Sequence, residues 1–563
     1  MSGLHRVFLG LSLSMILLGL SVTDGQAQEL ECASCDRIRR DHPETVIGEI
    51  RIIHQNIFEP EDKLPAYFPW RTLNRLHRNT REGVIRRELL FAEGDRLNPD
   101  LVREVRRNLR ALDLFRDERI ECSLLETGKV GIDVYLRENW SLIPIFQIQG
   151  VDTAQAVTLG VTEQNLLGRG KRLSAWGRKG TEARNTFIED SWGVRYVDPN
   201  IMGSWYRFSG TIQDLETGEF LQAIAERPFY SLETPWSVSL FGRHFRRDRR
   251  LIRNGKIASV FEQQDVSAGI DFSYALQRGP PVVHRIGPFY EYAQKRIQDY
   301  RILDADGEEL EPPPEDTISS VGIAYQRLGV DYIVEERISQ FGRREDFNIA
   351  NDLNLSAAFS AELLGADGDE WIFSLSDAQG HSFRKGHFLF LNASAQGTWN
   401  GDRVRNGLFS VAYDHYLRDT FLDGGPFLHT LHWLGSFDYG THLDPDRLLG
   451  LGYSNGLRGY SRDAFTGDKR LLLSVEDRIF LTENLFRLVA LGVLVFFDTG
   501  FVWDEGQSVD LADLRHAVGA GLRVALPAVA GTNVLQLTWG FPLGSGVDPL
   551  GDSVFTVATS TGF

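Results

Sequence analysis

Gly456-Leu457-Arg458-Gly459-Tyr460 lies within Gly450–Thr466, a stretch rich in glycine and polar residues that is typical of a loop. Glycine tolerates tight turns and positive φ angles, so an arginine between two glycines can be directed at a fixed target. Downstream, Glu476 and Asp498 fall on the polar faces of two expected strands. This pattern predicts a charge cluster in which the loop arginine meets two carboxylates inside a barrel.

The segment around Asp498 alternates in the manner of a barrel strand. Between Leu488 and Trp503, odd positions carry large apolar side chains, whereas even positions include alanine, glycine and Asp498. An outer-membrane barrel turns such an apolar face to lipid and the other face to its lumen. In a soluble sandwich the apolar face would instead be buried in a core. Similar short segments recur after Trp140, for example Val534–Phe541.

The length of this region sets the expected strand number. At about 26 residues for each strand and loop, roughly 420 residues allow about 16 strands, an even number. Closure is expected because an open sheet edge would leave backbone groups unpaired in lipid. We therefore predict a mainly β fold, with a 16-stranded transmembrane antiparallel β-barrel over residues 140–563.

The amino-terminal residues are typical of a targeting signal. Val7–Val22 is apolar, follows His5 and Arg6, and precedes small residues that end at Ala27. At 16 residues this apolar stretch is short for a membrane helix, which is the alternative interpretation. We expect a signal peptide over 1–27 and a polar segment over 28–44.

Three cysteines remain after the expected cleavage, namely Cys32, Cys35 and Cys122. An exported chain meets an oxidising compartment, so one disulfide can form, and the sequence leaves its pairing open. Cys32-Ala-Ser-Cys35 has the spacing of a redox motif. It lies in a polar tail ahead of the first expected strand, which disfavours a redox function.

Residues 45–139 predict a small α+β domain. Val46–Ile53 is typical of a strand, and Thr80 is a candidate cap for a helix carrying Val84 and Ile85. Asn98-Pro99 is a strong helix start. A strand with alternating apolar residues ends near Glu138. The second helix also carries a stripe of basic side chains, which we interpret as a solvated face rather than a contact with lipid or a partner: Arg103, Arg106, Arg107 and Arg110.

Composition and motifs exclude several function classes. A net charge of −17 argues against nucleic acid as a partner. Gly452–Gly456 fits the Gly-x-Ser-x-Gly pattern of hydrolases, but a glycine-rich loop follows where the nucleophile elbow needs a helix. No phosphate loop, zinc pattern or dinucleotide fingerprint occurs. We predict no enzyme activity, no catalytic residue, no metal site and no cofactor.

The Gly456–Tyr460 stretch resembles the Arg-Gly-Tyr/Phe motif of the outer-membrane assembly superfamily. This BamA/TamA family pairs POTRA domains with a barrel of the bacterial surface antigen type and includes the secretion partners of two-partner systems. Further segments resemble the family's barrel motifs in the same order: Gln164–Gly170, Asp198-Pro199, Glu476-Asp477-Arg478, Phe496–Gly500 and Gly519–Arg523.

The resemblance implies a role for each motif. Residues 45–139 would be one periplasmic POTRA domain. Arg458 would project from an extracellular loop into the lumen, with Glu476 and Asp498 as its partners on the lumen wall. A guanidinium, with five donors, can satisfy two carboxylates at once. The alternating carboxyl terminus resembles the sorting signal of outer-membrane barrels, carried by Phe555, Val557 and Phe563.

The resemblance also implies a function. The chain would assist the insertion or translocation of outer-membrane or secreted polypeptides at the bacterial outer membrane. Its partners would be membrane lipids, unfolded polypeptide clients and periplasmic chaperones or accessory proteins. The alternative is a passive pore or surface barrel without assembly activity.

Overall fold

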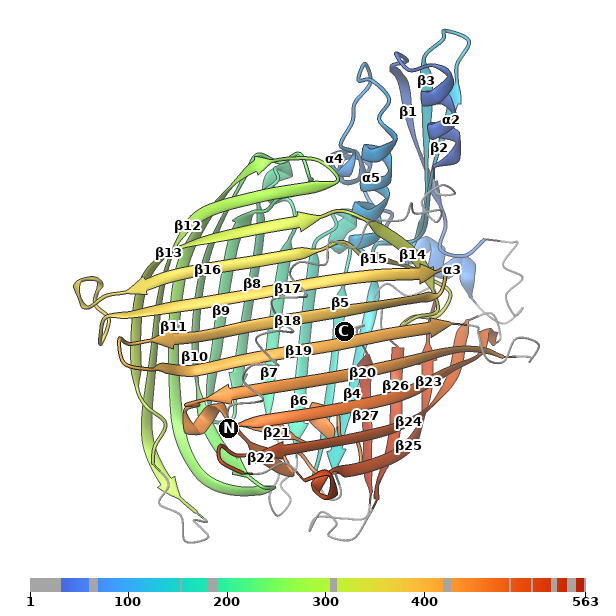
Figure 1. The fold of residues 1–563 in the computed structure, drawn as a ribbon. Coiled ribbons are helices and arrows are strands. Elements are labelled where there is room, and N and C mark those ends of the chain that lie inside the picture. Colours follow the sequence, from blue (N-terminus) through green and yellow to red (C-terminus); the bar gives the residue numbers. More distant parts are fainter. Residues whose placement is uncertain are drawn as a thin grey trace.

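A computed structural model describes residues 32–59, 69–151, 154–180, 190–303, 311–418, 427–485, 488–507, 510–527, 534–543 and 553–560. These residues form a small α+β region followed by a large antiparallel barrel (Figure 1). The expected signal peptide lies outside the described residues. None of the described helices has both the length and the apolar character needed to cross a membrane.

The amino-terminal region is built on a three-stranded sheet of order β1-β3-β2, in which β1 and β3 run parallel. Its elements are α2 (Ala33–Asp41), β1 (Ile47–Gln55), α3 (Trp70–Leu76), α4 (Glu82–Glu88), α5 (Pro99–Ala111), β2 (Phe115–Leu124) and β3 (Val130–Glu138). The expected order of one strand, two helices and two strands is present for residues 45–139, but an additional helix, α3, precedes the two expected helices. The helix α2 directly after Cys32 was not expected.

Local chemistry explains the helix ends and the cysteines. The Asn98 side chain accepts a hydrogen bond from the backbone N–H of Asp100, so the expected cap of α5 is confirmed. The Thr80 side chain does not cap α4, whose first flanking residue is Arg81. A disulfide joins Cys35 on α2 to Cys122 on β2 and fixes this helix against the sheet.

The barrel contains 20 strands within the described residues, so the prediction of 16 was wrong. They are β4 (Leu142–Val151), β5 (Ala154–Glu163), β6 (Arg172–Gly180), β7 (Ser191–Asp198), β8 (Arg207–Leu215), β9 (Gly218–Arg227), β10 (Trp236–Arg253), β11 (Lys256–Gln277), β12 (Val282–Ile302), β13 (Asp316–Gly329), β16 (Asp352–Ser360), β17 (Glu370–Arg384), β18 (His387–Trp399), β19 (Val404–Arg418), β20 (Leu428–Thr441), β23 (Lys469–Leu485), β24 (Val489–Trp503), β25 (Arg515–Ala525), β26 (Val534–Leu543) and β27 (Val554–Ser560).

The strand number was underestimated because several turns are very short. Two residues connect β8 to β9, β10 to β11, and β17 to β18. The allowance of about 26 residues for each strand and its loop was therefore too generous. Each strand pairs antiparallel with its sequence neighbour around the barrel, and β27 lies beside β4.

The outer face of the barrel is apolar. Exposed large side chains recur at every second position of the strands, as with Phe373 and Leu375 on β17 or Val495 and Phe497 on β24. Asp498, between two outward residues, is fully buried on the inner face. This alternation is the pattern expected of a barrel that turns one face to lipid.

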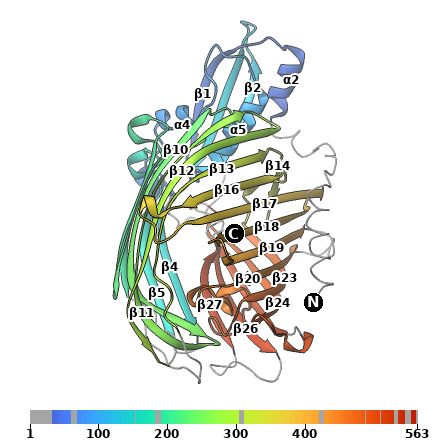
Figure 2. The same ribbon diagram turned by 60° about the vertical axis from the view of Figure 1, so that its left-hand side comes forward.

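The amino-terminal region sits at one mouth of the barrel (Figures 1 and 2). Thr80 donates through its backbone N–H and its hydroxyl to the buried Glu138 carboxylate, and Asn165 in the β5–β6 turn donates to the Thr80 hydroxyl at 2.9 Å. Burial opposes ionisation of Glu138, but hydrogen bonds from His54, His77 and Thr80 outweigh it and lower its pKa. Polar contacts thus tie this region to the barrel.

Two segments fold into the lumen from opposite mouths. At the mouth occupied by the amino-terminal region, the connection between β13 and β16 forms a hairpin of β14 (Tyr332–Glu336) and β15 (Arg344–Asn348). At the far mouth, the connection between β20 and β23 contains the short pair β21 (Leu449–Leu451) and β22 (Phe465–Gly467). Figure 1 shows these two pairs near opposite ends of the barrel.

Candidate functional site

The loop between β20 and β23 carries Gly456–Tyr460 back into the lumen. Leu457 is fully buried and Tyr460 is 2% exposed, so the loop tip does not lie free in solvent. Tyr460 donates its hydroxyl proton to the backbone carbonyl of His516 on β25, at 3.2 Å. The loop is therefore packed against the barrel wall beside the three strands β23 to β25.

Glycines make this close packing possible. Gly456 has φ 103°, in the left-handed region that favours glycine. A Cβ on Gly459 would lie 2.8 Å from the Cβ of Ala517, and a Cβ on Gly540 of β26 would lie 1.5 Å from the carbonyl oxygen of Arg458. Gly540 was not singled out in the sequence, because its need for a small side chain comes from a loop far away in the chain.

Arg458 binds both predicted carboxylates. Its Nε and Nη2 donate to the two oxygens of Asp498 at 2.9 and 2.8 Å, which is a bidentate pair. Its backbone N–H also donates to Asp498, at 3.1 Å, and its Nη1 donates to Glu476. Asp498 is fully buried and Glu476 is 6% exposed. Removing one partner of such a buried cluster typically costs about 3–5 kcal/mol, because the remaining charge is left uncompensated.

Two further residues complete the environment of the guanidinium. The Ser474 hydroxyl accepts a hydrogen bond from Arg458 Nη2 at 3.1 Å and donates to Asp498 at 2.7 Å. The Arg458 guanidinium carbon lies 3.6 Å from the ring centroid of Phe496, a cation–π contact. Both residues occupy inward positions next to Glu476 and Asp498, so the alternation could have identified them.

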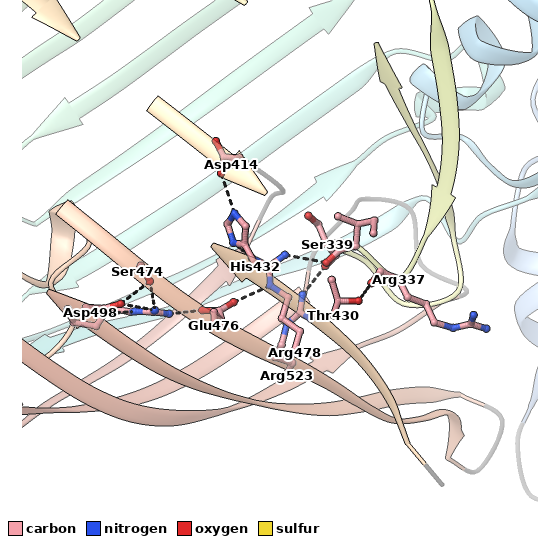
Figure 3. A network of polar contacts seen from close by, with 12 residues as sticks. Arg337, Ser339, Asp414, Thr430, His432, Ser474, Glu476, Arg478, Asp498 and Arg523 are labelled. Carbon is pink, nitrogen blue, oxygen red and sulfur yellow. Dashed lines mark hydrogen bonds and ion pairs between the residues drawn. The ribbon is translucent and has the colours of Figure 1, made fainter. Parts of the chain in front are cut away.

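The cluster extends from Glu476 to a second arginine. Arg478 donates to Glu476 at 2.7 Å through Nε and to the backbone carbonyl of Ile338 at 2.9 Å through Nη1. Its Nη2 lies 3.3 Å from His432 Nδ1, and His432 Nε2 lies 2.9 Å from Asp414. Figure 3 shows this network running between the strands of one wall and the segment that carries Ser339. Arg478 thus connects the far-mouth loop with the near-mouth hairpin.

The remaining predicted residues are separate from this cluster. Phe555 is half-exposed on the outer face of β27, Val557 is buried, and Phe563 lies outside the described residues. Their role in sorting stays a prediction. Asp477, between two inward residues, points outward and pairs with His429 at 3.0 Å.

The arrangement holds the far-mouth loop in one position against the barrel wall. Its donors and acceptors bind one another, and Leu457 of the loop that they hold is fully buried. Within the part of the chain that the structure describes, no three His, Cys, Asp or Glu side chains gather as a metal site.

Comparison with known proteins gives structural matches only. No family model and no curated protein sequence matches the chain. A BamA structure from Haemophilus ducreyi lacking POTRA domains 1–3 matches 91% of this chain and 84% of its own, with 12% identity and a TM-score of 0.37. CdiB from Acinetobacter baumannii matches 92% of this chain and 73% of its own, with 11% identity and a TM-score of 0.45.

CdiB from Escherichia coli also matches, over 92% of this chain and 76% of its own, with 14% identity and a TM-score of 0.45. These matches are to structures named BamA and CdiB, and the sequence motifs resemble the same superfamily. At these identities and TM-scores, the likeness carries no further conclusion.

Proposed function

We propose that this chain is a bacterial outer-membrane barrel of the BamA/TamA type, which assists the insertion or translocation of outer-membrane or secreted polypeptides. One observation carries the proposal. A loop from the far mouth is folded into the lumen and held there by Arg458 on Asp498 and Glu476. In this proposal residues 45–139 form the POTRA domain, the near mouth faces the periplasm, and the far mouth faces the cell exterior.

We call the contacts of Arg458 with Asp498 and Glu476 the Arg458 latch. This latch between the loop and the wall favours a gated translocator over an open pore. Two segments occupy the lumen, one from each mouth, and a permanently open channel would need neither. A buried guanidinium with two carboxylates is costly to assemble unless its donors find acceptors, and for Arg458 each of the three guanidinium nitrogens donates at least one hydrogen bond. Such a cluster suits a part that must hold one conformation and release it as a unit.

The amino-terminal sheet supplies a site for clients. Its outer strands are β1 and β2, and an extended polypeptide can add to such an edge through backbone hydrogen bonds. Ser34 of α2 already accepts a hydrogen bond from the N–H of Cys122 on β2. Ser34 therefore occupies this edge at Cys122, and a client would add to the rest of β2, beside α2, which the disulfide holds in place.

Depletion of the chain in its native bacterium tests the function. We expect outer-membrane or secreted polypeptides to accumulate in the periplasm, and photo-crosslinkers at exposed positions of β2 to capture them. A crosslinker on the exposed far-mouth loop residue Leu363 is the matched control. An unchanged outer-membrane and secreted proteome after depletion would remove the assembly role.

Conductance separates the proposal from the passive-pore alternative. In planar bilayers the wild-type chain should be mostly closed, because the loop and the hairpin occupy its lumen. Stable, large conductance of the unmodified chain, together with an unchanged proteome after depletion, would favour the passive pore.

A further inference from the structure

The hairpin of β14 and β15 reaches across the near mouth and ends inside the lumen. At its tip, Ile338 is fully buried and Phe341 is 2% exposed. The Glu345 carboxylate accepts hydrogen bonds from the backbone N–H groups of Ile338, Ser339 and Gln340, at 2.9 to 3.3 Å. These bonds give the tip a defined shape, so that its carbonyl groups point in fixed directions.

The wall of the barrel binds the carbonyl groups of this tip. Thr430 on β20 donates to the carbonyl of Arg337 at 2.8 Å. Arg478 on β23 donates to the carbonyl of Ile338, and Arg523 on β25 donates to the carbonyl of Ser339 at 2.5 Å. Three consecutive carbonyls are therefore held by three different strands.

Apolar packing adds to these bonds. Phe341 packs edge-on against Phe480 of β23, with ring centroids 5.0 Å apart. Ile333 and Ile338 form a second buried cluster with Phe388 of β18. The hairpin thus fits the inner wall over the strands from β18 to β26, on the side of the lumen that also holds Arg458.

The other side of the hairpin binds the amino-terminal region. Arg110 of α5 forms a bidentate pair with Asp346, with distances of 2.6 and 2.7 Å. Asp113, just after α5, pairs with Arg343 at 2.9 Å. The Arg107 guanidinium lies over the ring of Tyr332, 4.4 Å from its centroid. The basic stripe of α5 is therefore a contact surface, and its interpretation as a solvated face was wrong.

These contacts form one continuous path. Arg110 holds Asp346 at the base of the hairpin, Arg478 holds the carbonyl of Ile338 at its tip, and Glu476 accepts bonds from both Arg478 and Arg458. Every link is a hydrogen bond or ion pair between charged or backbone groups. The path leads from the region that would meet a client to the loop at the opposite mouth.

We propose that the hairpin of β14 and β15 couples the amino-terminal region to the Arg458 latch. Displacing α5 from Asp346 and Arg343 frees the hairpin, which withdraws its carbonyl groups from Arg478 and Arg523. Arg478 then loses its fixed position against Glu476, and the loop that carries Arg458 becomes easier to open. The purpose of this coupling, release of the latch on client binding, rests on the proposed function, whereas the coupling itself is a property of the chain alone.

Hydrogen exchange of the full chain in lipid nanodiscs, without any client, tests the coupling. The variant combines Asp346→Asn with Arg343→Ala, which removes both ion pairs to α5 and leaves every residue of the barrel wall and of the far-mouth loop intact. We expect the rate of hydrogen exchange to rise at least about fivefold in the hairpin, over 332–348, and also in the far-mouth loop, over 452–463. A factor of about five is the lower end of typical coupling between two sites. Hydrogen exchange measures whether a change at the hairpin alters the far-mouth loop, which the short distances between them cannot show by themselves.

Asp133→Asn is the matched control. It removes another bidentate Arg–Asp pair of the same region, formed with Arg51 at 2.7 and 2.8 Å, far from the hairpin. Exchange in the loop should stay at the wild-type rate in this control. Asp346→Asn alone serves if the double variant does not fold, and should act in the same direction.

Three outcomes would overturn the proposal. They are faster exchange in the hairpin with an unchanged loop, no change in either segment, and an equal rise in the Asp133→Asn control. Because no client is present, these results are independent of the depletion experiment. Failure of the coupling and failure of the assembly function can therefore be told apart.

Discussion

The two segments that enter the lumen are held by opposite means. The far-mouth loop presents a charged side chain, Arg458, to carboxylates on the wall. The near-mouth hairpin presents backbone carbonyls to wall side chains, two of them arginines, and adds buried aromatic packing. For the loop, the arginine side chain that makes the contact lies on the inserted segment. For the hairpin, the arginine side chains that make the contacts lie on the wall.

The difference has a consequence for mutation. A single carboxylate holds the loop through three hydrogen bonds, so one substitution can release it. The hairpin is held by several weaker contacts, so single substitutions should loosen it in steps. Four predictions test this contrast, from the largest expected effect to the smallest.

Asp498→Ala should have the largest effect. It leaves the buried Arg458 guanidinium without its bidentate partner, at a cost of about 3–5 kcal/mol. The folded barrel should lose heat resistance in detergent gels. Asp190→Ala breaks an exposed pair with Lys179 and should leave heat resistance unchanged. Equal resistance of Asp498→Ala and wild type would contradict the latch.

Phe341→Ala should come next. It removes a buried ring that packs against Phe480, and the loss should be about 3 kcal/mol, at the low end for such a change because the hairpin can relax. Calorimetry in detergent would measure it. Leu363→Ala, at a position that is 95% exposed, is the control and should cost nothing measurable. If Phe341→Ala lowered stability more than Asp498→Ala, the hairpin rather than the loop would be the segment that depends most on one residue.

Gly540→Ala should disturb the loop without touching any charge. The added Cβ would overlap the Arg458 carbonyl oxygen, and overpacking of this kind costs about 1–3 kcal/mol. Protease sensitivity of the loop should rise. A Cβ at Gly242, on β10, would meet no atom within 4 Å, so Gly242→Ala should be neutral in the same assay. Equal sensitivity of both variants would show that the loop does not need this close approach.

Thr430→Val should have the smallest effect. It keeps the shape of the side chain but removes one hydrogen bond to the carbonyl of Arg337, worth about 1 kcal/mol. Hydrogen exchange should rise more in the hairpin of β14 and β15 than in the strands of the barrel wall. Thr398→Val on β18 is the control substitution and should leave hydrogen exchange of the hairpin unchanged. A loss of stability as large as that of Asp498→Ala would mean that the hairpin, too, depends on a single bond.

Much of the fold could be predicted because it repeats along the chain. Alternation of apolar and polar residues showed a barrel, and Asn98-Pro99 showed where α5 begins. The number of strands could not be predicted in this way, because it depends on turn lengths that alternation does not reveal. The pairing of Cys35 with Cys122 required the position of α2 against β2.

The candidate site, too, contains residues that the sequence could predict and residues that it could not. Arg458, Glu476 and Asp498 were expected to meet, since a charged side chain between glycines and two inward acids can be recognised as residues. The basic stripe of α5 was misread, because nothing in its spacing says whether water or Asp346 faces Arg110. Gly540 was passed over for the same reason.

The sequence by itself determined the barrel and the charged partners inside it, because periodicity and ionisable side chains are properties of particular residues. Only the tertiary structure decided the closure at 20 strands, the path of the hairpin and its contacts with Arg478 and Arg523. The physical reason is that every residue has a backbone carbonyl. Which carbonyls are bound depends on where the folded chain places them, not on which residues carry them.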